Sequence, residues 1–154
     1  STQLFEYIED AFPEPPLWPR GVAGRARARR LEHESDEVYF PHIIRLMGLE
    51  DDLQGEAALA AIAAAQAFCL RMEALLANRA WLAGEFGYAD IAFYMATLFG
   101  ERKGAPLTDA MPRLQDWRQR MTQRPSVARV AGAMGRWLRS QDRPVPWFLQ
   151  EVVK

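Results

Sequence analysis

The sequence predicts an all-α fold, a bundle of five or six helices. Apolar residues recur at spacings of three and four along most of the chain, which is the period of an amphipathic helix. No segment alternates apolar and polar residues as a half-buried strand does. The 154 residues are 49% apolar and 25% charged, which is the length and composition of a globular domain with its own core.

The chain opens with a predicted short helix and a linker. Residues 1–12 carry one apolar face and form the helix. Residues 13–21, PEPPLWPRG, form an extended linker, because four prolines between positions 13 and 19 exclude a helix. Leu17 and Trp18 are expected to pack onto a neighbouring element, since a solvated linker rarely contains a tryptophan.

Residues 22–47 are predicted to form one long helix, which Pro41 kinks or breaks because proline lacks an N–H and clashes with the preceding turn. The first half contains the run RARARR, a pattern also seen in nucleic-acid patches. Acidic residues follow at once, and pairs such as Arg30 and Glu34 stand four apart. A solvated, salt-bridged helix face is the better interpretation, and we predict no nucleic-acid partner.

The remaining segments complete the predicted bundle. A loop at 48–56 leads into an alanine-rich helix. Its buried stripe is expected to comprise Leu59, Ile62, Ala65, Cys69, Met72 and Leu76. Further helices are predicted at 88–100, 111–124 and 126–140, the last two separated by Pro125. The tail, 141–154, contains an aromatic cluster and is expected to pack back onto the bundle.

Patterns of catalytic or metal-binding residues are absent from the sequence. The two histidines and the single cysteine lie far apart, so no metal site is predicted, and His33 with Glu37 is interpreted as a surface pair. Cys69 lies on an apolar helix face and is interpreted as a buried, inert thiol. No phosphate-binding loop or nucleophile elbow occurs. These absences argue against an enzyme complete within these residues.

Charge and cysteine content indicate the surroundings of the protein. The formal net charge is −1, so no overall field attracts nucleic acid or a membrane surface. The longest uninterrupted apolar run is far shorter than the roughly 20 residues of a membrane-spanning helix. The chain as given opens without the pattern of a signal peptide, and one cysteine cannot form an internal disulfide. We therefore expect a cytoplasmic protein with no membrane partner.

The stretch FGYADIAFY places an aspartate just before an apolar run. With Gly87 as the N-cap, Asp90 is the third helical residue, and its carboxylate can accept a hydrogen bond from the Gly87 backbone N–H. Phe86 and Ile91 occupy the positions of a hydrophobic staple. The carboxylate also lies near the positive end of the helix dipole. Gly87 and Asp90 are therefore interpreted as a structural capping box.

Four stretches together resemble the cytosolic glutathione transferases. In that family a Leu-x-Gly turn leads to Ser/Thr-x-Ala-Asp and a buried central helix, and WLAGEFGYADIAFY resembles this segment, with Gly87 in place of the usual Ser or Thr. The opening STQLFEYIEDAFPEPPLWP resembles the last helix of the family's thioredoxin-like domain and the linker after it. RARARR resembles the start of the first long helix that follows, and MPRLQDWRQRMTQRPSVARV resembles the Pro-x-Leu-x-x-Trp…Arg-Pro-x-Val segment.

This resemblance implies a division of the chain. Residues 1–12 would be the last helix of a thioredoxin-like domain, 13–21 a linker, and 22–154 an all-helical domain of the transferase C-terminal type. In the family, the thioredoxin-like domain carries most of the glutathione site and the residue that activates the thiol, so no catalytic residue is assigned here. Ser1 matches a glutathione-contacting serine at the start of that helix. We expect the chain alone to be inactive.

The resemblance also implies a function for the whole protein. It would conjugate the thiolate of glutathione, its co-substrate, to a small hydrophobic electrophile, and it would form a homodimer. Tyr39 and Phe40, in the middle of the long helix, are candidates for the apolar wall of the electrophile site; the alternative for each is a place in the core or in a dimer interface. A second hypothesis is a non-catalytic, transferase-like helical module that binds other proteins.

Overall fold

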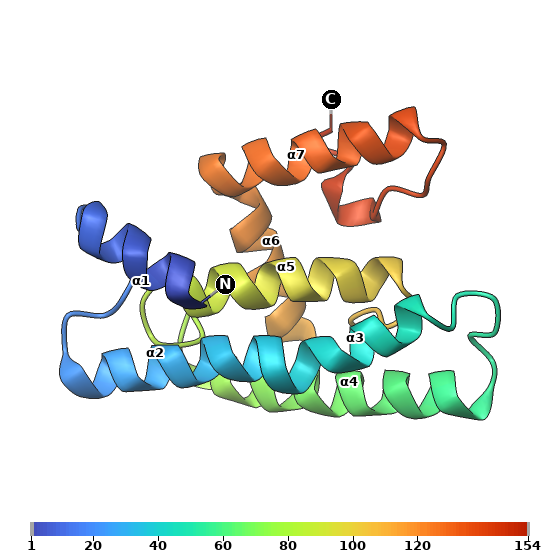
Figure 1. Cartoon of the computed structure of the whole chain (residues 1–154), viewed down its shortest axis with the longest axis horizontal. Helices are drawn as coiled ribbons and strands as arrows, with labels where there is room; N and C mark the ends of the chain where they lie inside the picture. Colours follow the sequence, from blue (N-terminus) through green and yellow to red (C-terminus); the bar gives the residue numbers. More distant parts are fainter. Residues whose placement is uncertain (1, 154) are drawn as a thin grey trace.

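A computed structural model describes residues 2–153, in which every regular element is a helix (Figure 1). The elements are α1 (Thr2–Ala11), α2 (Val22–Glu34), the π-helical segment η1 (Ser35–Tyr39), α3 (Phe40–Met47), α4 (Glu56–Leu75), the 3₁₀ turn η2 (Leu76–Asn78), α5 (Tyr88–Arg102), α6 (Pro112–Gln123), α7 (Pro125–Ser140) and the 3₁₀ turn η3 (Trp147–Leu149). Since α2, η1 and α3 are continuous, the described residues form six long helical segments. The predicted all-α fold is confirmed.

The long helix formed by α2, η1 and α3 passes through Pro41 without ending. Pro41 has no N–H to offer the carbonyl four residues back, and its ring crowds that carbonyl. Just before it, η1 widens into a π-helix, in which the Phe40 N–H donates to the carbonyl oxygen of Ser35. The helix then continues to Met47. The wider turn is how this chain accommodates the proline that the sequence places inside a helix.

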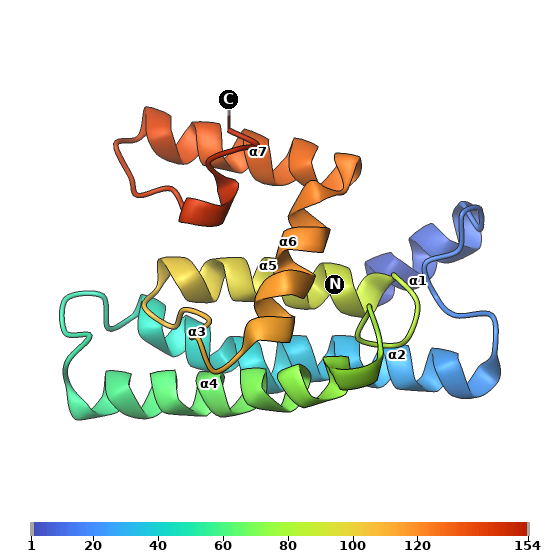
Figure 2. The ribbon, with the colours of Figure 1, turned by 180° about the vertical axis from the view of Figure 1, so that it is seen from behind.

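The apolar helix α5 lies in the middle of the bundle. It packs against α2, η1, α3 and α6, and α4 packs against α3 and α6 (Figures 1 and 2). Ten of the 15 residues of α5 are buried, which is why its sequence is apolar on nearly every side. Tyr39, Phe93 and Trp117 are among the largest fully buried side chains and join three of these helices.

The predicted stripe of α4 is correct in its second half and wrong in its first. Leu59 is 49% exposed, so it lies outside the core of the described residues, and Ile62 is only partly buried. Ala58 and Ala61 are buried in their place. The small alanine side chains let α3 approach α4 closely, because the distance between helix axes depends on the side chains at the contact.

One helix in the described residues is long and apolar enough to cross a membrane by length and composition alone. It is the 23-residue Glu56–Asn78, formed by α4 and η2, a length that the sequence analysis did not anticipate. A buried helix of a bundle meets the same criterion, and this one contributes Phe68 and Met72 to the core. Length and composition are therefore weak evidence for a membrane span here.

The linker and the tail both anchor onto the bundle. Trp18 is 3% exposed, and the Glu9 carboxylate of α1 accepts hydrogen bonds from the backbone N–H groups of Leu17 (3.0 Å) and Trp18 (3.1 Å). In the tail, Leu149 is fully buried while Trp147 stays largely exposed. The expectation that Trp18 and the tail pack back onto the helices is confirmed.

Candidate functional site

An open cavity of about 570 Å³ lies between α1, η1, α3 and α5. Its lining comprises Phe5, Asp36, Glu37, Phe40, Pro41, Ile44, Ile91, Ala92, Met95, Ala96 and Phe99. Ala92 and Ala96 stand one turn apart on α5. Their side chains are small, so they leave space in the cavity that larger side chains at these positions would fill. The volume falls in the range of about 300–1,000 Å³ that is typical of small-molecule sites.

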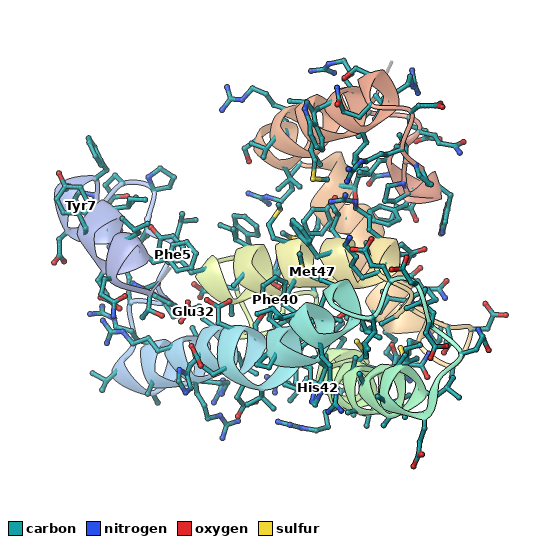
Figure 3. The ribbon with its side chains drawn as sticks, turned by 45° about the vertical axis from the view of Figure 1, so that its right-hand side comes forward. Phe5, Tyr7, Glu32, Phe40, His42 and Met47 are labelled. Carbon is teal, nitrogen blue, oxygen red and sulfur yellow. The ribbon has the colours of Figure 1, made fainter. Side chains whose placement is uncertain are left out.

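Phe40, one of the two predicted wall residues, lines this cavity. It is partly buried, and its ring meets Phe99 of α5 edge-on, with ring centroids 6.0 Å apart. Figure 3 shows Phe40 on the side of α3 that faces α5 and His42 on the opposite side. Phe5 contributes to the lining from α1. The position suits an apolar wall, and a role in substrate binding stays a prediction.

Tyr39, the other candidate, does not line the cavity. Its side chain is fully buried, with ring centroids 5.5 Å from Phe68 and 5.3 Å from Phe93. Tyr39 points from the long helix toward α4 and α5 in the core rather than toward the cavity. Burial raises the pKa of Tyr39 well above its ordinary value. Tyr39 is therefore a core residue, the alternative that the sequence left open.

The core around Tyr39 also contains Cys69. Burial raises the pKa of the Cys69 thiol to about 12, so the thiol stays protonated at neutral pH. A protonated thiol is a poor nucleophile and a poor metal ligand. Within residues 2–153 no group of three or more His, Cys, Asp or Glu side chains is placed to hold a metal ion.

Carboxylates border the cavity on the side of α2 and η1. Asp36 and Glu37 line it, and no lysine or arginine among residues 2–153 does. One turn earlier, the fully buried Glu32 accepts the hydroxyl of Thr2 on both oxygens, at 3.0 and 3.1 Å. Sequence reasoning missed Glu32, because nothing distinguishes it from the exposed acids around it until α1 packs over α2. Ser1, the predicted glutathione contact, lies outside the described residues.

Asp90 fixes the start of α5 through three hydrogen bonds. Its Oδ2 accepts the Gly87 N–H at 3.2 Å, which is the bond that a capping box requires. Its Oδ1 accepts the Leu82 N–H at 3.0 Å and the indole N–H of Trp117 at 2.8 Å. The carboxylate is fully buried, and burial raises its pKa to about 6 although the three hydrogen bonds lower it. Asp90 therefore joins the preceding loop, α5 and α6.

The approach of the linker to the start of α5 accounts for a glycine at position 87, where the helix cap alone would allow serine or threonine. A Cβ at this position would lie 2.2 Å from the carbonyl oxygen of Leu17, which accepts the Tyr88 N–H at 3.2 Å. A serine or threonine would meet the same carbonyl. The backbone N–H of Asp90, for which Gly87 offers no side-chain acceptor, donates to the carbonyl oxygen of Gly87 at 3.0 Å. The glycine thus allows the linker to approach the start of α5.

Comparisons with known proteins identify the fold. The family "Glutathione S-transferase, C-terminal domain" matches residues 33–125, more than half of the chain. A search of curated protein sequences found no match.

Three solved structures illustrate the similarity. FzlA from C. crescentus superposes with a TM-score of 0.81 at 24% identity, over 97% of this chain and 69% of that protein. A glutathione S-transferase from Rhodospirillum rubrum F11 gives 0.73 at 24% identity, over 83% of this chain and 62% of its own length. A glutathione S-transferase from Methylobacterium radiotolerans, solved in complex with glutathione sulfonate, gives 0.69 at 24% identity, over 83% and 63%.

At these identities the superpositions establish the fold, and the chain spans less than two thirds of the two transferases. The family match over residues 33–125 establishes more than the fold, because it covers the long helix from residue 33 onward and all of α4, α5 and α6, including Asp90. The chain therefore belongs to the glutathione S-transferase C-terminal domain family.

Proposed function

We propose that this chain is the C-terminal portion of a glutathione S-transferase, and that its cavity forms the apolar wall of the electrophile site. The observation that carries the proposal is the placement of Phe40. Phe40 lines a cavity of about 570 Å³ together with residues of α5 and with Phe5 of α1. Glutathione, as co-substrate, would bind mainly outside the described residues, as the length of the transferases above suggests.

The chemistry divides between the two parts of such a protein. The thiolate is the nucleophile, so the part that binds glutathione must stabilise the ionised sulfur. This chain would hold the electrophile, and Phe40, Met95 and Phe99 would exclude water around it. The exposed Glu37 gives the lining negative charge, which favours neutral or cationic electrophiles over anionic ones.

The outward face of α4 supports a homodimer as part of this proposal. Leu59 and Leu70 are 49% and 46% exposed, with exposed alanines between them. No charged residue occurs between Glu56 and Arg71. An uncharged, exposed apolar helix face of this length suits contact with a second copy of the chain. Sedimentation of the wild type and of Leu70→Glu would test this homodimer. We expect a dimeric wild type and a monomeric variant, and a monomeric wild type would contradict the proposal.

The non-catalytic module remains the competing proposal, and α1 is the observation that favours it. Leu4 and Tyr7 of α1, and Phe12 directly after it, are 66%, 67% and 68% exposed. The α1 segment therefore presents apolar side chains that a further domain or partner would cover. A thioredoxin-like domain would cover this face in a transferase. A separate protein partner would cover it in an assembly module.

One comparison separates the two. The chain should be produced alone and together with the residues encoded upstream of Ser1, and both proteins assayed for conjugation of glutathione to an aromatic electrophile and for retention on immobilised glutathione. The transferase proposal predicts saturable turnover by the longer protein and none by the chain alone. A coding sequence that starts at Ser1, or a longer protein that folds but neither binds glutathione nor turns over, would favour the module.

A further inference from the structure

A second cavity, of about 440 Å³, lies at the other end of α5, away from Asp90. It is enclosed by the end of α5, the loop between α3 and α4, and the segment after α7. Its lining comprises Glu50, Glu101, Arg102, Lys103, Arg143 and the segment Pro144–Pro146. The proposed electrophile site uses none of these residues.

Pairing within this cavity leaves two positive charges over. Lys103 forms an ion pair with Glu50. Glu101 forms an ion pair with Arg118, with the Arg118 Nη1 2.9 Å from the Glu101 carboxylate. Arg102 and Arg143 form no ion pair with any residue in 2–153, although both line the cavity. The charged side chains of the lining sum to +1. Because Arg118, from outside the lining, neutralises Glu101, the guanidinium groups of Arg102 and Arg143 are left without an ion-pair partner, although the Glu50 carboxylate attracts both.

The side chain of Arg102 is held by an aromatic ring, whereas Arg143 is exposed and only its backbone is held. The guanidinium of Arg102 lies over the ring of Phe99, 5.3 Å from its centroid. Arg143 begins the segment that carries Pro144 and Pro146, and its backbone N–H donates to the carbonyl oxygen of Leu138 at 2.9 Å. Proline restricts the backbone, so the segment loses little further freedom when a ligand binds.

The two guanidinium groups also repel each other. Burial lowers the pKa of Arg102 below its ordinary value, and the positive charge of Arg143 lowers it further, while the negative charge of Glu50 opposes the shift. The carboxyl end of α5 opposes an anion, but the N–H groups of Lys103 and Ala105 already bond the carbonyl oxygens of Phe99 and Gly100 there. A bound anion would remove the repulsion between the arginines and give both an acceptor.

We propose that this cavity binds a small phosphorylated molecule, with its phosphate held between Arg102 and Arg143. The planar fork of a guanidinium matches the oxygens of a phosphate, and such charge-assisted hydrogen bonds are the strong ones. The volume exceeds that of a phosphate group, which leaves room for an organic part against Val145 and Pro146. The site is independent of the proposed transferase activity.

The test is a titration of the chain with inorganic phosphate and with a phosphorylated sugar, at an ionic strength held constant with chloride. Binding is followed by calorimetry and by the amide NMR signals of residues 101–104 and 143–146. We expect saturable binding of both, tighter for the sugar phosphate. Arg102→Gln and Arg143→Gln should each weaken it about tenfold, as loss of one charge-assisted contact predicts.

Arg139→Gln is the matched control, because it removes the same charge from an exposed position on α7 outside the cavity. An equal loss in this control, or the absence of saturable binding by the wild type, would overturn the site. If Arg102→Gln fails to fold by circular dichroism, Arg102→Lys keeps the charge, loses the fork and should still weaken binding. Retention of the chain on vesicles containing a phosphate-headgroup lipid would overturn the assignment to a small molecule.

Discussion

Asp90→Ala should cost more stability than the loss of an exposed helix cap. The substitution leaves three buried donors without an acceptor, namely the N–H groups of Gly87 and Leu82 and the indole N–H of Trp117. Each unsatisfied buried donor costs roughly 1–3 kcal/mol, so the three together cost about 6 kcal/mol. For comparison, removal of an ordinary N-cap costs about 1 kcal/mol.

Removal of a buried charge offsets part of this cost. Burial raises the pKa of Asp90 from an ordinary value of 3.8 to about 6. At pH 7 the Asp90 side chain is ionised. Each unit of pKa shift corresponds to 1.36 kcal/mol, so a shift of about two units makes the folded protein about 3 kcal/mol less stable with Asp90 ionised than with Asp90 protonated. We therefore expect Asp90→Ala to lower the free energy of unfolding by about 3 kcal/mol at pH 7.

The same shift gives a pH dependence with a defined sign. Because the pKa of Asp90 is higher in the folded than in the unfolded protein, folding takes up a proton between these two values. The protonated Asp90 carboxyl group therefore adds to the free energy of unfolding. This added stability is fully present below about pH 4 and is lost as the pH rises through about 6. The stability difference between wild type and Asp90→Ala should therefore widen as the pH falls from 7 to 4.

Urea unfolding followed by tryptophan fluorescence at several pH values measures both effects. Asp90→Asn keeps acceptors for two of the three donors but turns an N–H toward Gly87, so it should be destabilised and lose the pH-dependent part. Asp116→Ala is the control, since it removes an exposed carboxylate from α6 and should stay within about 0.5 kcal/mol of wild type. Equal unfolding midpoints for wild type and Asp90→Ala would refute the reasoning.

Two further predictions concern contacts between elements. Gly87→Ala should destabilise the chain by about 1–3 kcal/mol, because the added Cβ would lie 2.2 Å from the Leu17 carbonyl oxygen. Gly21→Ala is the control and should be nearly neutral, since its Cβ would have nothing within 4 Å. Equal melting temperatures for the two variants would contradict the close approach of the linker to Gly87. Glu73 of α4 accepts the N–H groups of Arg113 (3.3 Å) and Leu114 (2.8 Å) at the start of α6. Glu73→Ala should therefore lower stability by about 1–2 kcal/mol, and unchanged urea midpoints would show that α6 needs no cap from α4.

The helices could be predicted from the sequence because their signals are local. Apolar residues located α5, and Pro112 marked the start of α6. Pro125 was predicted to separate the last two helices, and in the structure it is the first residue of α7. The hydrogen bond between Gly87 and Asp90 spans three residues, so a helix-start pattern predicts it. Leu82 and Trp117, the other two partners of Asp90, come from a preceding loop and from another helix, and no spacing in the sequence connects them to it.

The candidate site could be predicted only in part, for the same reason. The resemblance indicated the middle of the long helix, but the structure places Tyr39 in the core and Phe40 at the cavity. Which of two adjacent residues faces a cavity depends on the phase of the helix, and the π-helical turn before Pro41 shifts that phase. Leu59 was assigned to the core by spacing alone, whereas the close approach of α3 buries smaller neighbours.

The proposed function depends on Phe40 acting as a wall of the electrophile site. The most direct measurement is the KM for an uncharged aromatic electrophile, at saturating glutathione, in the protein that includes the residues encoded upstream. We expect Phe40→Ala to raise this KM about tenfold, as the loss of a buried aromatic contact implies, with the KM for glutathione unchanged. Met47→Ala, an exposed position on α3 outside the cavity, should change neither value. Equal effects of the two substitutions on the electrophile KM would contradict the account.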